Sequence, residues 1–324
     1  MKVARDSSGE YSDCGYRYLD FEKFDDGSQE EVLFYGYASG RNKQLIDEHK
    51  DFKRKIFYQG EQPCGFYSQN TVERQQSFDL GNDFDEVYST CPYSAKWMNL
   101  IHGYDKYRPI IFPHNMNWAV GDEEHDRFID VMYWGNLPNA SVDVRHIIET
   151  IPKFKYAFFT LGHGLTPDLH QYVSGVNVPR TEMWGYLRRS KIMVTSNLLY
   201  MTDPEVAATK SLDRWKENEA FHLIDQKIMP QIKTRPIEAI FNKTLVLLKE
   251  DPWRIFDYWF NEGEHFLYYK NNEDLEDMIR EVTTNWDKYK HIPENAYKRA
   301  VDLYTTEKLY HNIKKGQDEF KFKH

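Results

Sequence analysis

The sequence predicts an α/β protein with two Rossmann-like lobes that face a cleft. Its 324 residues exceed one typical domain and fall short of three. Two series of short apolar strands alternate with helical stretches, which is the pattern of parallel sheets. A polar, acidic stretch without periodicity separates the two series. We expect a first lobe, a linker, a second lobe and a carboxy-terminal helix that returns to the first lobe, at residues 1–116, 117–127, 128–302 and 303–324.

The first lobe contains five expected strands. The first expected strand is at residues 1–5, and the other four are apolar runs at 31–36, 54–60, 85–90 and 108–114. The segment SAKWMNLIHGY lies between the last two runs and has helical character. Together these segments form a strand, helix, strand unit of the kind from which parallel sheets are built.

The second lobe repeats this alternation. We expect strands at 128–135, 155–162, 170–176, 191–196, 244–248 and 264–269, and helices at 142–152, 181–190 and 235–241. Residues 198–229 are longer than an ordinary connection and predict a functional insertion beside the cleft. Asn271 or Asn272 can cap the following helix, and Pro293-Glu294 begins a last helix long enough to reach the first lobe.

Composition and charge argue against several classes of protein. No run approaches the roughly 18 apolar residues of a spanning helix, and the start lacks the apolar core of a signal peptide, so we expect a cytoplasmic protein. Cys14, Cys64 and Cys91 have no CxxC spacing and no histidine cluster beside them, which argues against a disulfide framework or a zinc site. The net charge of −9 opposes general binding to a nucleic-acid backbone.

The segment KTRPIEAIF, which begins at Lys233, predicts an anion-binding helix start. Thr234 can cap the helix and Pro236 suits its first turn, so free backbone N–H groups and the positive end of the helix dipole meet an incoming anion. Lys233 and Arg235 add positive charge suited to a diphosphate, and Glu238 can accept hydrogen bonds from a ribose diol just beyond it. The alternative is that Arg235 and Glu238 form an exposed ion pair on a surface helix.

Read in order, the second-lobe segments IDVMYWGNL, KYAFFTLG, SKIMVTSN, KTRPIEAIFNKTLVLLKED and GEHFLYYKNNEDLEDMI resemble the carboxy-terminal half of GT-B-type glycosyltransferases, of the group 1 or family 4-like kind. In the first lobe, FDEVYSTCPYSAKWMNL and RPIIFPHN resemble the end of the acceptor lobe and the strand that leads to the interlobe hinge. The resemblance covers roughly residues 31–310 and implies that residues 128–302 form the nucleotide-sugar-binding lobe.

The resemblance also implies roles for individual residues. It assigns Glu238 to the donor ribose, and Arg235 and Lys233 to the diphosphate; Thr234, at the start of the same helix, is expected in the same donor site. It further brings loop residues near the phosphate, sugar and base: Gly135, Asn136, Gly162, His163, Val178 and Glu182. The chain departs from the family pattern where Pro230 replaces a second glutamate, which implies a reorganised recognition of the donor sugar. Asn242-Lys243 replaces the usual glycine after the helix, and an Arg/Lys pair after the first strands of the lobe is not evident.

A general base is required if the reaction inverts, because the acceptor hydroxyl must lose its proton as it attacks. Glu61 follows a buried strand, and its Gly-Glu-x-Pro setting resembles an acceptor-side loop of fucosyltransferases with the same architecture. His114 can orient a phosphate or the acceptor, or it can pack between the lobes; Asp13 is a weaker candidate for the base. No Asp-x-Asp flanked by apolar strand residues appears, and the cations with the helix dipole can neutralise the leaving diphosphate, so we expect no metal requirement.

These observations predict a hexosyl- or pentosyltransferase that moves a sugar from a nucleotide diphosphate donor to a hydroxyl. We expect a UDP-sugar as the donor, with a GDP-sugar as the alternative. A glycan, a lipid-linked molecule or hydroxymethylated bases of viral DNA could be the acceptor, and a flipped base would stack on aromatic side chains. Two other hypotheses are a non-catalytic nucleotide- or glycan-binding protein on the same scaffold and a sugar epimerase.

Overall fold

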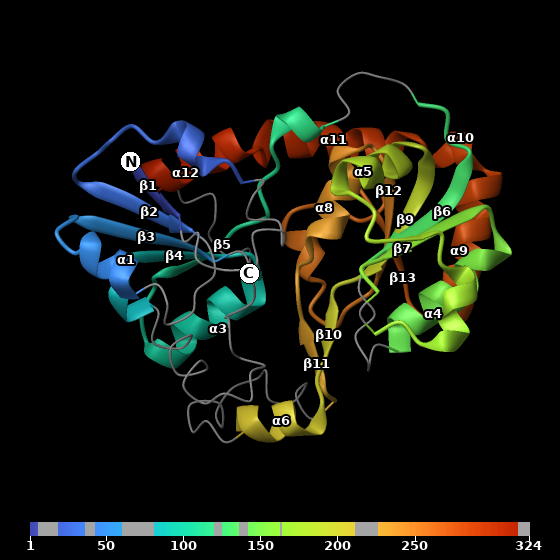
Figure 1. The fold of residues 1–324 in the computed structure, drawn as a ribbon, viewed down its shortest axis with the longest axis horizontal. Coiled ribbons are helices and arrows are strands. Elements are labelled where there is room, and N and C mark those ends of the chain that lie inside the picture. Colours follow the sequence, from blue (N-terminus) through green and yellow to red (C-terminus); the bar gives the residue numbers. More distant parts are fainter. Residues whose placement is uncertain are drawn as a thin grey trace. The chain divides into compact units, whose positions relative to one another are not determined.

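The computed structural model describes residues 1–5, 19–35, 43–59, 81–119, 125–135, 142–162, 164–210 and 226–316. The chain divides into two compact units (Figure 1). Unit 1 consists of Met1–Asn115, Leu199–Ile232 and Tyr304–His324, and unit 2 of Met116–Leu198 and Lys233–Leu303. Each unit contains a parallel sheet with helices packed against it, in a Rossmann-like layout. The predicted α/β fold class is therefore confirmed.

The sheet of unit 1 has five parallel strands in sequential order: β1 (Lys2–Arg5), β2 (Glu31–Tyr35), β3 (Arg54–Gln59), β4 (Glu86–Ser89) and β5 (Tyr107–Pro109). The helices described with it are α1 (Lys43–Glu48), the 3-10 helix η3 (Phe21–Phe24) and α3 (Pro92–His102). The middle strands are buried on both faces, as parallel strands covered on both sides are. β5 ends earlier than the predicted 108–114, since its last ladder pair joins Pro109 to Ser89.

Residues 199–232 belong to unit 1, whereas the sequence analysis placed them within the second lobe. They contain most of β10 (Leu198–Tyr200), α6 (Asp203–Lys210) and β11 (Ile228–Pro230), and β10 pairs with β11. Met201 and Met229 are buried in the core of unit 1 beside Trp97 and Met98 of α3. Burial of these apolar side chains explains the assignment, which the order of the segments along the chain could not reveal.

The predicted long carboxy-terminal helix is in fact two helices, α11 (His291–Leu303) and α12 (Thr306–Lys315). Thr305 interrupts it by adopting an extended conformation and accepting a 3.3 Å hydrogen bond from the N–H of Lys308, as an N-cap residue does. The backbone beside this cap pairs with His114 of the same unit: the N–H of His114 donates to Tyr304 O, and the N–H of Thr306 donates to His114 O. α12 belongs to unit 1 and α11 to unit 2.

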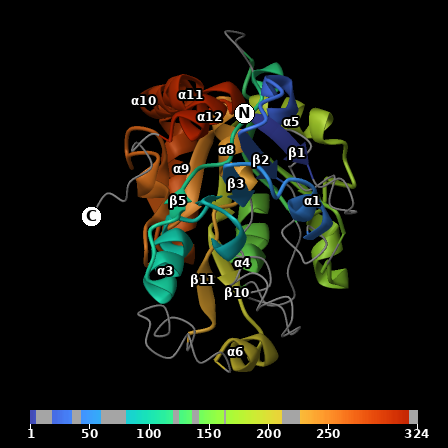
Figure 2. The same ribbon diagram turned by 90° about the vertical axis from the view of Figure 1, so that its left-hand side faces the viewer.

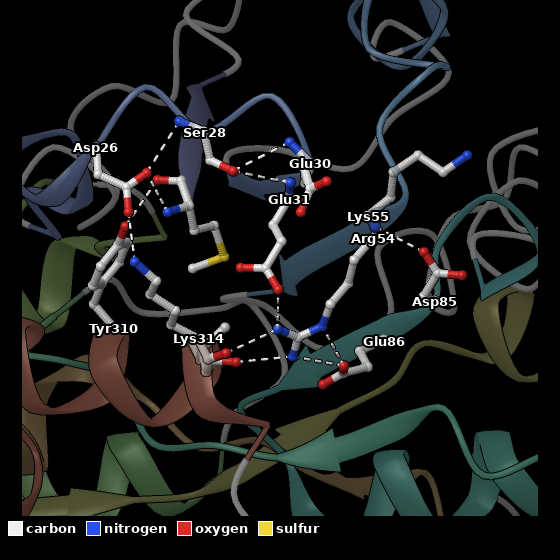
Figure 3. Close-up of polar contacts among 12 residues, drawn as sticks. Asp26, Ser28, Glu30, Glu31, Arg54, Lys55, Asp85, Glu86, Tyr310 and Lys314 are labelled. Carbon is white, nitrogen blue, oxygen red and sulfur yellow. Dashed lines mark hydrogen bonds and ion pairs between the residues drawn. The ribbon is translucent and has the colours of Figure 1, made fainter.

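Hydrogen bonds join helix α12 to the rest of unit 1 at the middle of the helix and at its carboxyl end. The hydroxyl of Tyr310 donates to Met1 O at 2.8 Å, and Figure 2 shows α12 beside the amino terminus. At the carboxyl end the guanidinium of Arg54 donates to the carbonyls of Ile313 and Lys314 at 3.0 and 2.9 Å (Figure 3). Arg54 also forms ion pairs with Glu31 and Glu86 on the neighbouring strands. A cation at a helix carboxyl terminus satisfies orphan carbonyls and opposes the negative end of the dipole.

The sheet of unit 2 has the strand order of a classical dinucleotide-binding fold. Its parallel strands lie in the order β13 (Leu267–Tyr269), β12 (Leu245–Lys249), β9 (Ser190–Ser196), β6 (Ile129–Trp134), β7 (Tyr156–Thr160) and β8 (Gly175–Val176). Counted within the unit from β6, this is the order 6-5-4-1-2-3. The direction of strand addition reverses between β6 and β9, and such a switch point is where α/β sheets bind ligands, outside the carboxyl ends of the strands.

Helices cover both faces of this sheet (Figure 1). α4 (Val142–Thr150) and α9 (Asn272–Thr284) pack against each other on one face, and α8 (Thr234–Phe241) packs with α5 (Arg180–Arg188) and α11 on the other. Asn271 caps α9, as predicted, by accepting from the N–H of Asp274. The predicted strand at 170–176 is wrong in its first half. Pro167 begins the 3-10 helix η7 (Pro167–Tyr172), so that only Gly175 and Val176 pair as β8.

Candidate functional site

Three described residues that the sequence analysis named, Gly135, Lys233 and Arg235, lie near the carboxyl ends of the strands around the switch point. Gly135 directly follows β6, Asn197 directly follows β9, and α8 is the helix that precedes β12 along the chain. We call this group the switch-point site. It comprises Tyr133, Trp134, Gly135, Asp143, Arg180, Ser196, Asn197, Lys233, Arg235 and Glu238, all of which belong to unit 2.

The guanidinium of Arg235 lies directly on Gly135. A Cβ atom added to Gly135 would come within 2.2 Å of Arg235 Cζ, and the backbone φ of +150° is one that residues with side chains rarely adopt. Arg235 Nη1 donates to the hydroxyl of Tyr133 at 3.3 Å, and its guanidinium stands 5.6 Å from the ring centre of Trp134. Among the described residues Arg235 has no carboxylate partner. Its charge is therefore held in place without being neutralised.

Lys233 is the N-cap residue of α8, in an extended conformation. Its N–H donates to Asn197 Oδ1 at 3.4 Å, and its ammonium donates to Leu198 O at 3.1 Å. Burial and the charge of Arg235 lower the pKa of Lys233 to about 7, while Asp143 opposes the shift. The predicted cap, Thr234, is instead the first residue of the helix, and the N-cap residue Lys233 makes no side-chain capping hydrogen bond within the described part of the chain. The N–H groups of the first turn are thus left for another acceptor.

Glu238 is buried, with 5% of its surface exposed. Its Oε1 forms an ion pair with Arg180 Nη2 at 2.7 Å. The Arg180 guanidinium lies 5.2 Å from the ring centre of Trp134. Within the described part of the chain Oε2 of Glu238 is buried and has no hydrogen-bond partner. The alternative of an exposed pair between Arg235 and Glu238 is wrong, because Glu238 is buried and pairs with Arg180.

The other predicted residues divide into three groups. Gly162 follows β7 with φ of +85°, Val178 precedes α5, and Glu182 is exposed in the first turn of α5. His114 is 5% exposed and lies in unit 1, where its backbone pairs beside Thr305. A last group lies outside the described residues: Asp13, Glu61, Asn136 and His163. Among the residues that are described, no group of three or more His, Cys, Asp or Glu side chains could hold a metal ion.

Sequence reasoning missed six members of the switch-point site: Tyr133, Trp134, Asp143, Arg180, Ser196 and Asn197. Arg180 lay inside the stretch expected near the base, but nothing local indicated that it would reach Glu238. Asn197 could have been found from its position directly after a predicted buried strand, where polar residues of parallel sheets gather at one edge. Asp143 opens the helix after β6, and its first-turn position was the available signal.

A family model described as "Glycosyl transferase-like" matches residues 144–315, which is more than half of the chain. The chain belongs to this family. The match covers α8 and most of unit 2, so the switch-point site lies largely within the segment that defines the family. No curated protein matches this glycosyl transferase-like chain by sequence.

Solved structures agree on the fold. HepE from Anabaena, in complex with UDP and glucose, superposes with a TM-score of 0.63 at 11% identity, covering 98% of this chain and 99% of HepE. TarM gives a TM-score of 0.57 at 14% identity, and the match covers 95% of this chain but only 58% of TarM. Sucrose-phosphate synthase from Thermosynechococcus elongatus gives 0.57 at 11% identity, with 88% and 72% covered. The glycosyl transferase-like chain therefore has the GT-B fold.

The ligands of these similar proteins are nucleotides and sugars. HepE was also solved with UDP-glucose, a variant of TarM from S. aureus with fondaparinux, α-GlcNAc-glycerol and UDP, and pneumococcal GtfA with UDP and GlcNAc. None of these complexes supports the modified-DNA acceptor. None of the helices described for this chain is both long enough and apolar enough to cross a membrane.

Proposed function

We propose that this chain transfers a sugar from a UDP-sugar to a hydroxyl group of a glycan or lipid-linked acceptor. The observation that carries this proposal is the guanidinium of Arg235, seated on Gly135 at the switch point without a carboxylate partner among the described residues. Lys233 lies beside it at the uncapped start of α8. Two cations and free helix N–H groups at one sheet edge suit a diphosphate better than any neutral ligand.

The roles within the donor site follow from these positions. Arg235 and Lys233 hold the diphosphate with Thr234 and the first turn of α8. Glu238 accepts hydrogen bonds from the ribose diol through Oε2, since Arg180 already occupies Oε1. We assign Gly135, Asn136, Gly162 and His163 to the phosphate and sugar, and Val178 and Glu182 to the base. A GDP-sugar is the alternative donor.

The departure of the leaving group explains why two cations are needed. As the bond between the sugar and the diphosphate breaks, negative charge builds up on the diphosphate and must be neutralised. Lys233, Arg235 and the positive end of α8 provide that neutralisation from the protein itself, so we propose that no metal ion is required. Turnover that persists in EDTA at the same rate would agree with this part of the proposal, and rescue by added Mg²⁺ or Mn²⁺ would contradict it.

The acceptor side belongs to the first lobe. We propose Glu61 as the base that removes the acceptor proton if the reaction inverts, and His114 as a group that orients the acceptor or a phosphate. The sugars named with TarM and GtfA favour a hexosyl over a pentosyl donor and a polyol hydroxyl as acceptor.

A nucleotide panel tests the proposal. Wild-type protein is titrated calorimetrically with UDP, GDP and ADP, and Arg235→Ala is compared with Arg145→Ala, a variant of an exposed arginine on α4. We expect UDP to bind and Arg235→Ala to weaken it by about 10- to 100-fold, the loss of one or two hydrogen bonds to a charged group. Equal UDP affinity in all three proteins would refute the site. UDP release from UDP-sugars then separates a transferase from a protein that only binds them.

A further inference from the structure

Asn197 is a buried amide whose hydrogen bonds are only half used. It is fully buried, and its Oδ1 accepts from the backbone N–H of Lys233 at 3.4 Å. A backbone N–H can only donate, so the oxygen of the amide must face it and the NH2 group must face away. Within the described residues this NH2 group has no partner. Leaving such donors unpaired costs about 1–3 kcal/mol, which indicates that something else accepts from them.

A carboxylate lies on the opposite face of the same strand end. Successive strand residues point to opposite faces, so Ser196 faces α4 where Asn197 faces α8. Ser196 Oγ donates to Asp143 Oδ2 at 3.4 Å, and Asp143 occupies the first turn of α4. Lys233 interacts with both sides: its ammonium donates a hydrogen bond to Leu198 O, and the negative charge of Asp143 raises the pKa of Lys233 against the larger lowering by burial. An amide donor and a carboxylate acceptor thus flank the end of β9 beside the anion site.

These two groups do not suit a phosphate. The amide could donate to a phosphate oxygen, but the carboxylate would repel it, and ionised phosphate has no proton to give. A hydroxyl suits both groups, since it accepts from the amide and donates to the carboxylate. A sugar ring carries several hydroxyls, so neighbouring hydroxyls can meet the two groups at once.

We propose that Asn197 and Asp143 form the subsite that binds hydroxyls of the donor sugar, next to the diphosphate held by Lys233 and Arg235. This inference rests on the proposed donor-binding function and adds to it the residues that recognise the sugar. Asn197 donates through Nδ2 and Asp143 accepts at its carboxylate. Ser196 holds the carboxylate in place.

The experiment compares UDP with UDP-glucose, UDP-galactose and UDP-GlcNAc by calorimetry, using wild type and Asp143→Asn. The wild type should bind at least one UDP-sugar more tightly than UDP. Asp143→Asn removes a negative charge near the diphosphate, so UDP should bind equally well or better, while that UDP-sugar should lose about tenfold. Opposite responses of the two ligands are the signature, because a purely structural defect weakens both together. Asn197→Ala should lower the ratio of UDP-sugar to UDP affinity in the same direction.

Asp130→Asn provides the matched control. Asp130 pairs with Lys191 near the amino end of β6, whereas the site lies at the carboxyl ends of the strands, so its replacement should leave both affinities unchanged. Thermal melting verifies that each variant is folded. If UDP and UDP-sugar affinities fall in parallel in Asp143→Asn, or if no UDP-sugar binds wild type more tightly than UDP, the sugar subsite is refuted while the diphosphate site stands. If wild type binds no nucleotide, the proposed function itself fails.

Discussion

Replacement of Gly135 by alanine should damage the anion site without touching a charged residue. The added Cβ would lie 2.2 Å from Arg235 Cζ and within 2.5 Å of both terminal nitrogens, whereas ordinary contact begins at 3.4 Å. The guanidinium must therefore retreat by about 1 Å, which breaks charge-assisted hydrogen bonds that require about 2.7–2.9 Å. With about 1.5–3 kcal/mol lost for a hydrogen bond to a charged group, UDP should bind roughly 10- to 150-fold more weakly.

Calorimetric titration with UDP measures this effect, and two controls isolate its cause. Gly263→Ala imposes backbone strain alone, because Gly263 has φ of +78° and no atom within 4 Å of the added Cβ. Both variants should lose about 1–2 kcal/mol of stability from strain, but only Gly135→Ala should lose affinity. The double variant Gly135→Ala/Arg235→Ala should bind UDP no more weakly than Arg235→Ala alone, since both substitutions remove the same contact between Arg235 and UDP. UDP affinity within twofold of wild type in Gly135→Ala would refute the seating of Arg235 on this glycine.

Three further predictions concern single residues. Glu238→Gln should remove the charge from the contact with the partly buried Arg180 and lower the free energy of unfolding by about 1.5–3 kcal/mol, as expected for a hydrogen bond to a charged group. Wild type but not this variant should prefer UDP to 2′,3′-dideoxy-UDP, and equal preference in both would contradict the ribose contact. Because the pKa of Lys233 is about 7 in the free protein, a bound diphosphate should draw a proton onto it, so UDP affinity should fall as the pH rises from 6 to 9. Calorimetry in buffers of different ionisation enthalpy measures the number of protons taken up when UDP binds. If Lys233→Arg shows the same pH dependence as wild type, a group other than Lys233 takes up the proton. Arg54→Ala should lower the free energy of unfolding of unit 1, measured by urea denaturation, by about 2 kcal/mol, because the carboxyl end of α12 loses its cation. A change below about 0.5 kcal/mol, or an equal loss in the control Arg108→Ala, would contradict this role of Arg54.

The strands and most helices could be predicted because their signals are local. Apolar runs bounded by polar residues gave β2, β3, β4, β6, β7, β9 and β12 within a residue or two of their observed bounds. The misassignments arose where local signals were weak or competed. Thr305 is a strong N-cap inside a helical pattern, and it divides α11 from α12. At residues 170–176 the apolar residues suggested a strand, but residues 170–172 belong to η7 and only Gly175 and Val176 pair as β8.

The sequence by itself determined the α/β class and the cationic start of α8, because alternating apolar runs and the spacing of Lys233, Arg235 and Glu238 are properties of neighbouring residues. Tertiary structure alone decided the partners of those side chains. Arg235 rests on Gly135 and bonds to Tyr133, which is 102 residues away, and Glu238 pairs with Arg180 on another helix. These contacts arise because parallel strands bring their carboxyl ends to one edge of the sheet, and no local pattern specifies which side chains meet there.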